Sequence, residues 1–304
     1  MIPDLALCRF QHGDDLPRLG LIADDRLYDL TALESPDYAT LEGWLLSASG
    51  QVEEALDKLE GIPKRAPALC SVRRLLDEKA EPHLVAPIDT QEVWACGVTY
   101  EMSREARKRE SEEPTVYGRV YDAPRPEVFF KATPHRVVGP GEAVAIRADS
   151  NWDVPESELT LLLTPNKEIV GFTVGNDMSS RNIEGENPLY LPQAKIYNRC
   201  CALGPVVRLV GRLDPLKLAV RCVIYREGKV AFEGETNTSK MHRPLSDMVE
   251  YLGRCNSFPT GVFMLTGTGV VPPDDFTLQS GDVVEITIEK LGTLRNPVIE
   301  MSIF

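Results

Sequence analysis

Short apolar segments separated by turn residues recur along the chain, and many of them span about four to eight positions, as β-strands do. Several, including residues 158–163, are apolar on both faces, which is typical of strands buried between two layers. We predict strands over residues 5–10, 18–23, 26–30, 92–100, 127–132, 143–148, 158–163, 168–175, 206–211, 218–225 and 283–289.

Helical spacing of apolar residues is less frequent. Two amphipathic helices are indicated on either side of Ser49-Gly50 by Leu41, Trp44, Leu45, Val52, Ala55, Leu56 and Leu59. Residues 244–255 predict a further helix, with Ser246 as its N-cap. Residues 103–113 are charged and lack a clean apolar stripe, so we expect an exposed helix there that acts as a mobile cover.

A polar, proline-bearing stretch between residues 65 and 90 separates a short mixed segment from a longer β-rich one. We therefore expect a small N-terminal α+β domain over residues 1–85 and a catalytic domain over residues 86–304. Because strands dominate the second part and helices are few, the predicted fold class is α+β and β-rich.

Acidic residues outnumber basic residues by 46 to 33, which gives a formal net charge of −13 at pH 7. Such a surface repels nucleic acid and anionic membranes, so we expect neither as a partner. The seven cysteines include no CxxC spacing and one adjacent pair, Cys200 and Cys201, which predicts neither a disulfide framework nor a zinc site. Together with the lack of a long apolar run, this pattern favours a cytoplasmic protein.

Several common catalytic motifs are missing from the sequence. It contains neither the GxSxG nucleophile elbow nor the GxxxxGK[ST] phosphate loop. The four histidines stand at positions 12, 83, 135 and 242, and no two of them share metal-ligand spacing. A Ser-His-Asp enzyme and a histidine-based zinc enzyme are therefore disfavoured.

Two carboxylates, Glu156 and Glu158, stand two positions apart immediately before an apolar run. Residues i and i+2 of a strand point to the same side, so these carboxylates repel each other unless a cation lies between them. Oxygen ligands suit Mg²⁺, Ca²⁺ or Mn²⁺, although the same pattern occurs on solvated strand faces. Asp177 ends another apolar strand and is either part of a site built at the strand end or part of an Asx turn.

Two lysines lie among apolar neighbours, where a lysine is either paired or functional. One is Lys195, in the segment YLPQAKIY, and the other is Lys131, in EVFFKA. In a strand, Glu127, Phe129 and Lys131 share a face. Glu127 and Lys131 therefore either flank one pocket or form a plain salt bridge.

The ordered set of segments in the second two-thirds of the chain resembles the fumarylacetoacetate hydrolase superfamily. It comprises RPEVFFKA, VVGPGE, the ExE of VPESEL, EIVGFTVGNDMSSRN, QAKIY with ALGP, LTGTG, and LQSGDVVEITIEKLGTLRNPV. The resemblance implies a mixed β-roll catalytic domain and Mg²⁺ held by Glu156, Glu158 and Asp177. It also implies active-site roles for Lys195 and Thr268, and assembly into a homodimer or homotetramer.

One departure from the family pattern narrows the expected chemistry. Hydrolases of the family carry a His-Glu dyad, whereas here Ser103 stands at the expected histidine position and no histidine occurs between residues 84 and 134. The segments GVTYEMSREAR and SSRNIEGENPLYLPQAK are instead similar to dehydratases of 2-keto-3-deoxy pentonates. This branch implies Mg²⁺-dependent dehydration of a small anionic acid, such as 2-keto-3-deoxy-D-arabinonate, to 2-oxoglutarate semialdehyde through a metal-stabilised enolate, with Mn²⁺ or Ca²⁺ as substitutes.

Residue roles follow from the same resemblance. Glu127 and Lys195 are the expected acid/base pair, with the base undecided between them, and Thr268 is expected to bind the substrate carboxylate. The expected substrate-binding residues are Arg104, Arg119, Tyr121, Lys131 and Glu184.

Other activities stay open at this point. A C–C hydrolase of an acylpyruvate or diketo acid needs Glu101, Glu105 or Glu110 in place of the missing dyad. An isomerase or decarboxylase would use the same metal site, and a sugar-acid sensor would keep the metal ligands without turnover.

Overall fold

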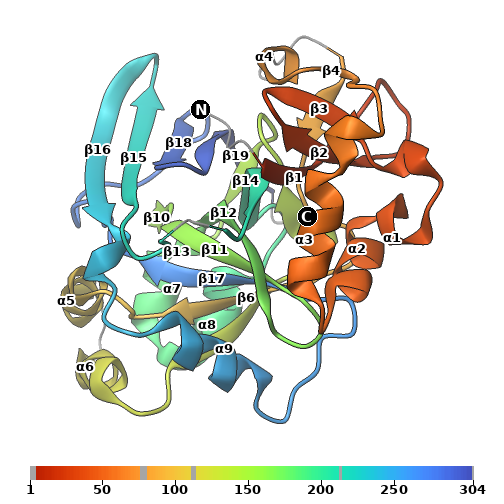
Figure 1. The fold of residues 1–304 in the computed structure, drawn as a ribbon. Helices are drawn as coiled ribbons and strands as arrows, with labels where there is room; N and C mark the ends of the chain where they lie inside the picture. Colours follow the sequence, from red (N-terminus) through yellow and green to blue (C-terminus); the bar gives the residue numbers. More distant parts are fainter. Residues whose placement is uncertain (1–4, 76–80, 111–113, 212–213, 303–304) are drawn as a thin grey trace.

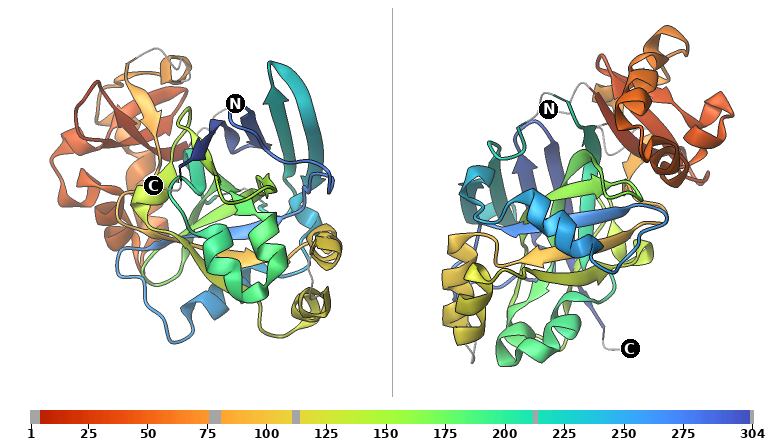
Figure 2. Two further views of the ribbon diagram at one scale, coloured as in Figure 1. Left: turned by 180° about the vertical axis from the view of Figure 1, so that it is seen from behind. Right: turned by 60° about the horizontal axis from the view of Figure 1, so that its bottom comes forward.

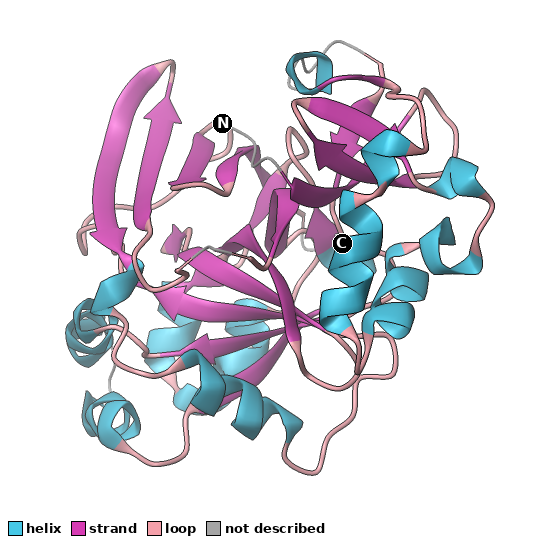
Figure 3. Cartoon of the chain, viewed as in Figure 1, coloured by secondary structure: helices cyan, strands magenta, loops and turns pink. Residues whose placement is uncertain are grey.

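The computed structural model contains a larger and a smaller β-sheet, and its helices lie around the larger one (Figures 1 and 3). It describes residues 5–75, 81–110, 114–211 and 214–302. The larger sheet has the strand order β4-β3-β2-β1-β14-β12-β11-β17-β6-β7, with β5 beside β1 and β8 beside β14. Its strands are β1 Leu5–Gln11, β2 Arg18–Ala23, β3 Arg26–Asp29, β4 Cys70–Ser71, β5 His83–Val85, β6 Glu92–Gly97, β7 Glu127–Ala132, β8 Val137–Val138, β11 Ser157–Leu163, β12 Ile169–Asp177, β14 Cys201–Leu209 and β17 Val262–Thr268.

The smaller sheet has five strands in the order β16-β15-β18-β19-β9. They are β9 Val144–Arg147, β15 Ala219–Arg226, β16 Lys229–Asn237, β18 Val283–Ile288 and β19 Gly292–Met301, and a separate pair joins β10 Asp153–Val154 to β13 Ser179–Ser180. The helices are α1 Pro36–Ala39, α2 Leu41–Ala48, α3 Val52–Glu60, α4 Val72–Leu75, α5 Glu101–Glu110, α6 Pro114–Asp122, α7 Arg181–Glu186, α8 Leu191–Lys195 and α9 Leu245–Gly253. The predicted β-rich α+β class is confirmed.

Alternation along β11 explains how the core is divided. Leu159, Leu161 and Leu163 belong to the apolar cluster shared with the smaller sheet, whereas Leu162 belongs to the cluster that includes Trp44 of α2. Every residue of β11 is buried, as expected for a strand covered on both faces. The larger sheet is therefore the middle layer, and the polar residues at its strand ends lie at the edge of a dry interior.

The N-terminal segment continues the larger sheet, because β1 pairs antiparallel with β14 through Ala6 and Leu7. Its helices α2 and α3 form the separate orange group in Figure 1. The expected boundary between an N-terminal domain of residues 1–85 and a second domain of residues 86–304 thus falls within one continuous sheet. The division into two domains stays a prediction. Within the described residues, no helix combines the length and hydropathy needed to cross a membrane.

Two expectations about helices were wrong. Helix α9 begins at Leu245 with Pro244 at the N-cap position, so Ser246 lies inside the first turn and does not cap it. Helix α5 is not an exposed cover, because Ser103, Ala106 and Arg107 are buried on one side of it. These residues are small or polar, so no apolar stripe marked the buried side, and residues 111–113 of the expected helix lie outside the described residues.

Candidate active site

Polar side chains gather where five neighbouring strands of the larger sheet end. Register pairs Glu158 of β11 with Thr268 of β17, and Gly97 of β6 with Glu127 of β7, while Asp177 is the last residue of β12. Helices α5, α7 and α8 lie around this end of the sheet (Figure 2). Strand pairing thus brings together residues that are up to 171 positions apart in the chain, from Gly97 to Thr268.

Three buried carboxylates form a cup at this position. Glu156, Glu158 and Asp177 each contribute one oxygen, and these oxygens lie within 4.8 Å of one another. The backbone holds the cup, because the Asp177 amide donates to the Glu156 carbonyl at 3.0 Å and the Gly267 amide donates to Glu158 Oε2 at 2.6 Å. Burial, together with the Asp177 and Glu156 carboxylates, raises the pKa of Glu158 well above its ordinary value. An all-oxygen donor set that repels itself in this way fits a hard divalent cation.

Lys195, at the end of α8, reaches into the cup. Its Nζ lies 2.9 Å from Glu156 Oε1, 3.0 Å from Asp177 Oδ2 and 2.6 Å from Ser179 Oγ. Burial alone would lower the pKa of Lys195, but the Asp177 and Glu156 carboxylates outweigh it and raise the pKa above its ordinary value. In this arrangement Lys195 is an ammonium ion that offsets part of the negative charge of the cup.

Glu127 faces the cup from the start of β7. Its side chain lies against Gly97, where any larger residue would collide with the Glu127 carboxylate. Burial raises the pKa of Glu127 to about 7, and Glu184 adds to this, although Arg107 and Lys195 oppose it. A carboxyl group with such a pKa is suited to proton transfer near neutral pH.

Lys131 shares a strand face with Glu127 but lies beneath the cup. It has no exposed surface, and its Nζ lies 2.5 Å from Asp177 Oδ1. It also donates to the carbonyls of Met178 at 2.9 Å and Lys195 at 2.6 Å. Lys131 therefore does not line the pocket, where a direct substrate contact was expected, and ties the end of β12 to the end of α8 instead.

Glu184 lines the pocket, as expected of a substrate-binding residue, and two arginines accompany it. Arg107 of α5 contacts Glu156 Oε1 at 2.6 Å and Glu184 Oε1 at 3.3 Å. Arg181 of α7 contacts the same two carboxylates at 3.1 and 3.3 Å. Arg107, Arg181 and Ser179 were not predicted as site residues from the sequence. The spacing of Ser103, Ala106 and Arg107 along a helix was the signal that could have placed Arg107 on the buried side of α5.

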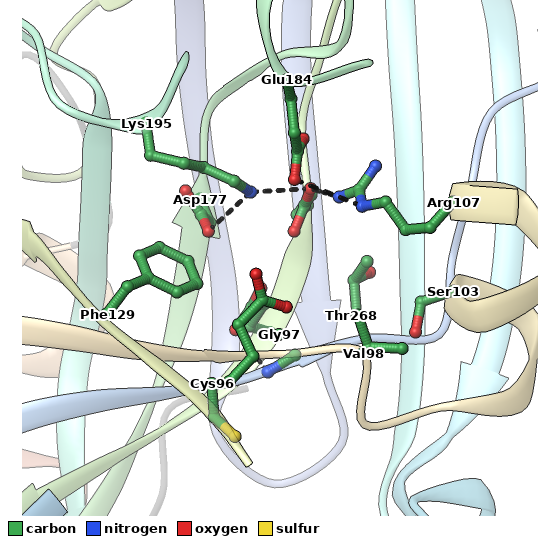
Figure 4. A pocket seen from close by; sticks show the side chains of 14 residues that line it. Cys96, Gly97, Val98, Ser103, Arg107, Phe129, Asp177, Glu184, Lys195 and Thr268 are labelled. Carbon is green, nitrogen blue, oxygen red and sulfur yellow. Dashed lines mark hydrogen bonds and ion pairs between the residues drawn. The ribbon is translucent and has the colours of Figure 1, made fainter. Parts of the chain in front are cut away.

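The enclosed space among these side chains is small, about 20 Å³, which is room for roughly one water molecule. Figure 4 shows Lys195 and Arg107 entering it from opposite sides, with Glu184 between them. No histidine is present among the described residues that line it, which are Cys96, Gly97, Val98, Ser103, Arg107, Glu127, Phe129, Glu156, Glu158, Asp177, Glu184, Lys195, Gly267 and Thr268.

Two hydroxyl groups of the pocket wall are held by the backbone. Thr268 Oγ1 donates to the Val270 carbonyl at 3.1 Å and accepts from the Val270 amide at 3.2 Å. Ser103 Oγ donates to the Tyr100 carbonyl at 2.8 Å at the start of α5. Thr268 thus faces the pocket as expected, and Ser103 occupies the place where hydrolases of the family were expected to have a histidine.

Three expected substrate-binding residues lie outside this pocket. Arg104 stacks on the ring of Tyr121 at 4.5 Å, and Tyr121 in turn stacks on His242 beside a separate cavity of about 900 Å³. Arg119 is exposed and donates back to Thr115 within α6. The side chains of these residues therefore do not reach the carboxylate cup.

The carboxylates proposed to replace the histidine dyad do not supply it here. Glu101 and Glu105 pair with Arg104 at 3.0 and 2.8 Å, and both line the larger cavity on the far side of α5. The side chain of Glu110 lies outside the described residues.

Comparisons with known proteins show the family of the chain. The family model described as fumarylacetoacetate (FAA) hydrolase C-terminal matches residues 92–299. A relative from Haloferax volcanii, named probable 2-keto-3-deoxyxylonate dehydratase, is 48% identical over 283 residues, which are 92% of this chain and 95% of the relative. A 2-dehydro-3-deoxy-D-arabinonate dehydratase from Saccharolobus solfataricus is 49% identical over 220 residues, 71% of this chain and 74% of the relative.

A solved structure extends the likeness to almost the whole chain. It is described as 2-keto-3-deoxy-D-arabinonate dehydratase complexed with magnesium and 2,5-dioxopentanoate. It superposes with a TM-score of 0.83 at 37% sequence identity and covers 97% of this chain and 99% of its own. The N-terminal segment is therefore shared with that protein as well.

Proposed function

Because the chain belongs to the fumarylacetoacetate hydrolase family, we propose that it is a Mg²⁺-dependent dehydratase of 2-keto-3-deoxy sugar acids. The substrate class includes 2-keto-3-deoxy-D-arabinonate, which loses water to give 2-oxoglutarate semialdehyde. The observation that carries this proposal is one buried pocket holding the carboxylate cup, Lys195 and Glu127 and, within the described residues, no histidine. The names of the similar dehydratases and the magnesium complex of one of them support it.

The cup residues Glu156, Glu158 and Asp177 are the ones that would hold Mg²⁺. Bound there, Mg²⁺ supplies Lewis-acid polarisation of the substrate's 2-keto group, which makes the C3 hydrogens more acidic. Binding also relieves the repulsion that raises the pKa of Glu158. The chain's own part is to place proton-transfer groups around the substrate.

Glu127 is the residue that we assign to proton transfer at C3. Its pKa of about 7 gives it a substantial ionised fraction near neutral pH, and it shares the pocket with the cup. Lys195 stays charged beside Glu156 and Asp177. We assign it to donating a hydrogen bond to the C4 hydroxyl in exchange for one of its present contacts, while Glu127 returns the C3 proton to this hydroxyl so that it leaves as water. Thr268 and Glu184 are left to orient the substrate's polar groups.

The charges around the pocket favour a divalent cation together with an anionic substrate. When Glu127 and Glu158 are both ionised, the carboxylates around the pocket outnumber the cations by one. The carboxylates are Glu127, Glu156, Glu158, Asp177 and Glu184, and the cations are Arg107, Lys131, Arg181 and Lys195. A bound divalent cation turns this excess of one negative charge into an excess of one positive charge, and a monoanionic 2-keto acid then neutralises it.

Mass spectrometry of the products tests the proposal against its alternatives. With Mg²⁺ present, we would supply 2-keto-3-deoxy-D-arabinonate in one reaction and an acylpyruvate in another. Dehydration gives a product lighter by one water, C–C hydrolysis gives two fragments, and isomerisation leaves the mass unchanged. The proposal expects water loss from the sugar acid and an intact acylpyruvate. Cleavage of the acylpyruvate alone would favour the hydrolase.

We also propose that the protein assembles into a homodimer or homotetramer and works in the cytoplasm. Support for the compartment comes from the seven cysteines, all of which are free thiols, including the adjacent pair Cys200 and Cys201. Light scattering coupled to gel filtration measures the assembly. A monomer at micromolar concentration would contradict it.

A further inference from the structure

The pocket must receive an anion, and among the described residues two cationic side chains line it, Lys195 and Arg107. An ammonium has three N–H donors, and Lys195 already faces three oxygens, those of Glu156, Asp177 and Ser179. A substrate carboxylate therefore gains a contact with Lys195 only at the expense of one of these partners. Arg107 enters from the opposite side (Figure 4).

Arg107 has the geometry that carboxylate recognition requires. A guanidinium presents five N–H donors in a planar fork that binds both oxygens of a carboxylate. The side chain is buried, and its Nε and Nη2 point toward Glu184 at 3.3 Å and Glu156 at 2.6 Å. The contact through Nε orients the fork toward the pocket.

The contact of Arg107 with Glu156 is one that can be exchanged. A carboxylate oxygen has two lone pairs. Glu156 Oε1 nevertheless lies within 3.1 Å of four donors, on Arg107, Lys195, Ser179 and Arg181. If Arg107 moves to another acceptor, Glu156 keeps three partners, so no buried charge is left unpaired.

Space for this exchange exists on the far side of α5. The pocket itself, at about 20 Å³, is too small for a five-carbon acid. Glu101, Glu105 and Arg109 on the opposite face of α5 line the cavity of about 900 Å³. The helix that carries Arg107 therefore separates a tight pocket from open space, and a shift toward that space enlarges the pocket.

We propose that Arg107 is a substrate-binding residue that exchanges its contact with Glu156 for the carboxylate of the 2-keto acid. The inference deepens the proposed function and rests on it. It assigns anion recognition to helix α5, which forms one wall of the pocket, whereas Lys195 comes from α8 and the carboxylate cup from β11, the residues just before it, and β12.

Calorimetric titration of pyruvate into Mg²⁺-saturated protein tests this assignment, because pyruvate is a 2-keto acid with no C4 hydroxyl to lose. Loss of a charge-assisted hydrogen-bonded contact in Arg107→Gln is expected to raise the pyruvate Kd roughly 10- to 100-fold. The Mg²⁺ Kd measured without pyruvate is expected to stay the same or fall, since the variant loses a cation beside Glu156. Arg107→Lys keeps the charge but lacks the planar guanidinium, so its pyruvate Kd should lie between those of the wild type and Arg107→Gln. If Arg107→Gln does not fold, the Arg107→Lys variant decides the test.

Arg109→Gln is the matched control, because Arg109 lies on the same helix and pairs with Asp274 at 3.4 Å away from the pocket. It should bind pyruvate as the wild type does. A wild-type pyruvate Kd in both Arg107 variants would overturn the proposal. So would a parallel loss of Mg²⁺ binding, which would mean that Arg107 only positions Glu156. If the wild type binds Mg²⁺ and pyruvate but dehydrates no sugar acid, only the dehydratase proposal is overturned. If it binds neither Mg²⁺ nor pyruvate, the dehydratase proposal and the assignment of Arg107 are both overturned.

Discussion

Replacing Lys195 with alanine is expected to stop dehydration while the carboxylate cup still binds Mg²⁺. The side chain contacts Glu156 at 2.9 Å and Asp177 at 3.0 Å, so its removal takes a cation from two of the proposed metal ligands at once. Each ligand nevertheless keeps another cation close by. Arg107 lies 2.6 Å from Glu156, and Lys131 lies 2.5 Å from Asp177.

These distances set the expected magnitudes. A buried ion pair that loses one partner costs about 3–5 kcal/mol when the other charge is left alone. Here both carboxylates stay paired, so we expect about 1–3 kcal/mol of lost stability, close to the cost of a buried polar group without its partner. Turnover should fall by about 100- to 1,000-fold, the usual cost of losing one preorganised hydrogen-bond donor to a group that gains negative charge. The Mg²⁺ Kd should not rise, because an ammonium that competes for the same oxygens has gone.

Calorimetry for Mg²⁺, urea unfolding and mass spectrometry of the product give the three readouts. Lys217→Ala is the control, since the side chain of Lys217 is 78% exposed and pairs only with the nearby Asp214 in the described structure. Undiminished turnover in Lys195→Ala would remove Lys195 from the mechanism. A Mg²⁺ Kd that rises as far as turnover falls would assign Lys195 to the architecture of the cup instead.

Three further changes have definite expected outcomes. Glu127→Gln should lower turnover about 100- to 10,000-fold. In the wild type, kcat/KM should rise with pH as Glu127 loses its proton, with a midpoint at or below the pKa of about 7, because bound Mg²⁺ lowers that pKa. A flat wild-type profile from pH 5 to 8 would contradict this role. Glu158→Gln should weaken Mg²⁺ binding by about tenfold or more. In EDTA it should raise the melting temperature, because the fold disfavours the ionised form of Glu158 and thereby raises its pKa. A lower melting temperature would contradict this expected stabilisation. Lys131→Met should lose about 1–3 kcal/mol in urea unfolding for each of the two carbonyls that lose their donor, because Asp177 loses one ion-pair partner but stays paired with Lys195. A total loss under about 1 kcal/mol would show that Lys131 matters little to the fold.

Strand periodicity made much of the candidate site predictable. The two-residue repeat placed Glu127 and Lys131 on one face of β7, and Asp177 was recognised as a strand end. The carboxylate pair at 156 and 158 was expected to share one side, and the structure brings both into one cup with Asp177. The predictions for β7 and β12 required only the local geometry of a strand. Glu156 lies just before β11, which begins at Ser157, so its place in the cup depends also on the Asp177 amide that donates to its carbonyl.

Depth along a strand was not predictable in the same way. Glu127 reaches the pocket, whereas Lys131, on the same face, lies fully buried beneath Asp177. The difference depends on α8, whose terminal carbonyl accepts from Lys131. Alternation gives the face of a side chain, but the distance from the sheet edge comes from elements far away in the sequence.

The buried side of α5 was hidden for a different reason. A helix usually shows its packed side as an apolar stripe, but α5 packs Ser103, Ala106 and Arg107 against a polar pocket. Arg104, three residues before Arg107, points instead to Tyr121 beside the larger cavity. Charged residues in a helix thus gave no indication of which arginine faces the site, and only the tertiary arrangement separates them.

Metal dependence of water loss is the most direct test of the account. The protein would be stripped with EDTA, supplied with 2-keto-3-deoxy-D-arabinonate, and followed by mass spectrometry before and after Mg²⁺ is added back. The account predicts no reaction without the cation and a product lighter by one water once Mg²⁺ is restored to the cup of Glu156, Glu158 and Asp177. Water loss at the same rate in EDTA, or an unchanged sugar acid in Mg²⁺ beside a cleaved acylpyruvate, would contradict it.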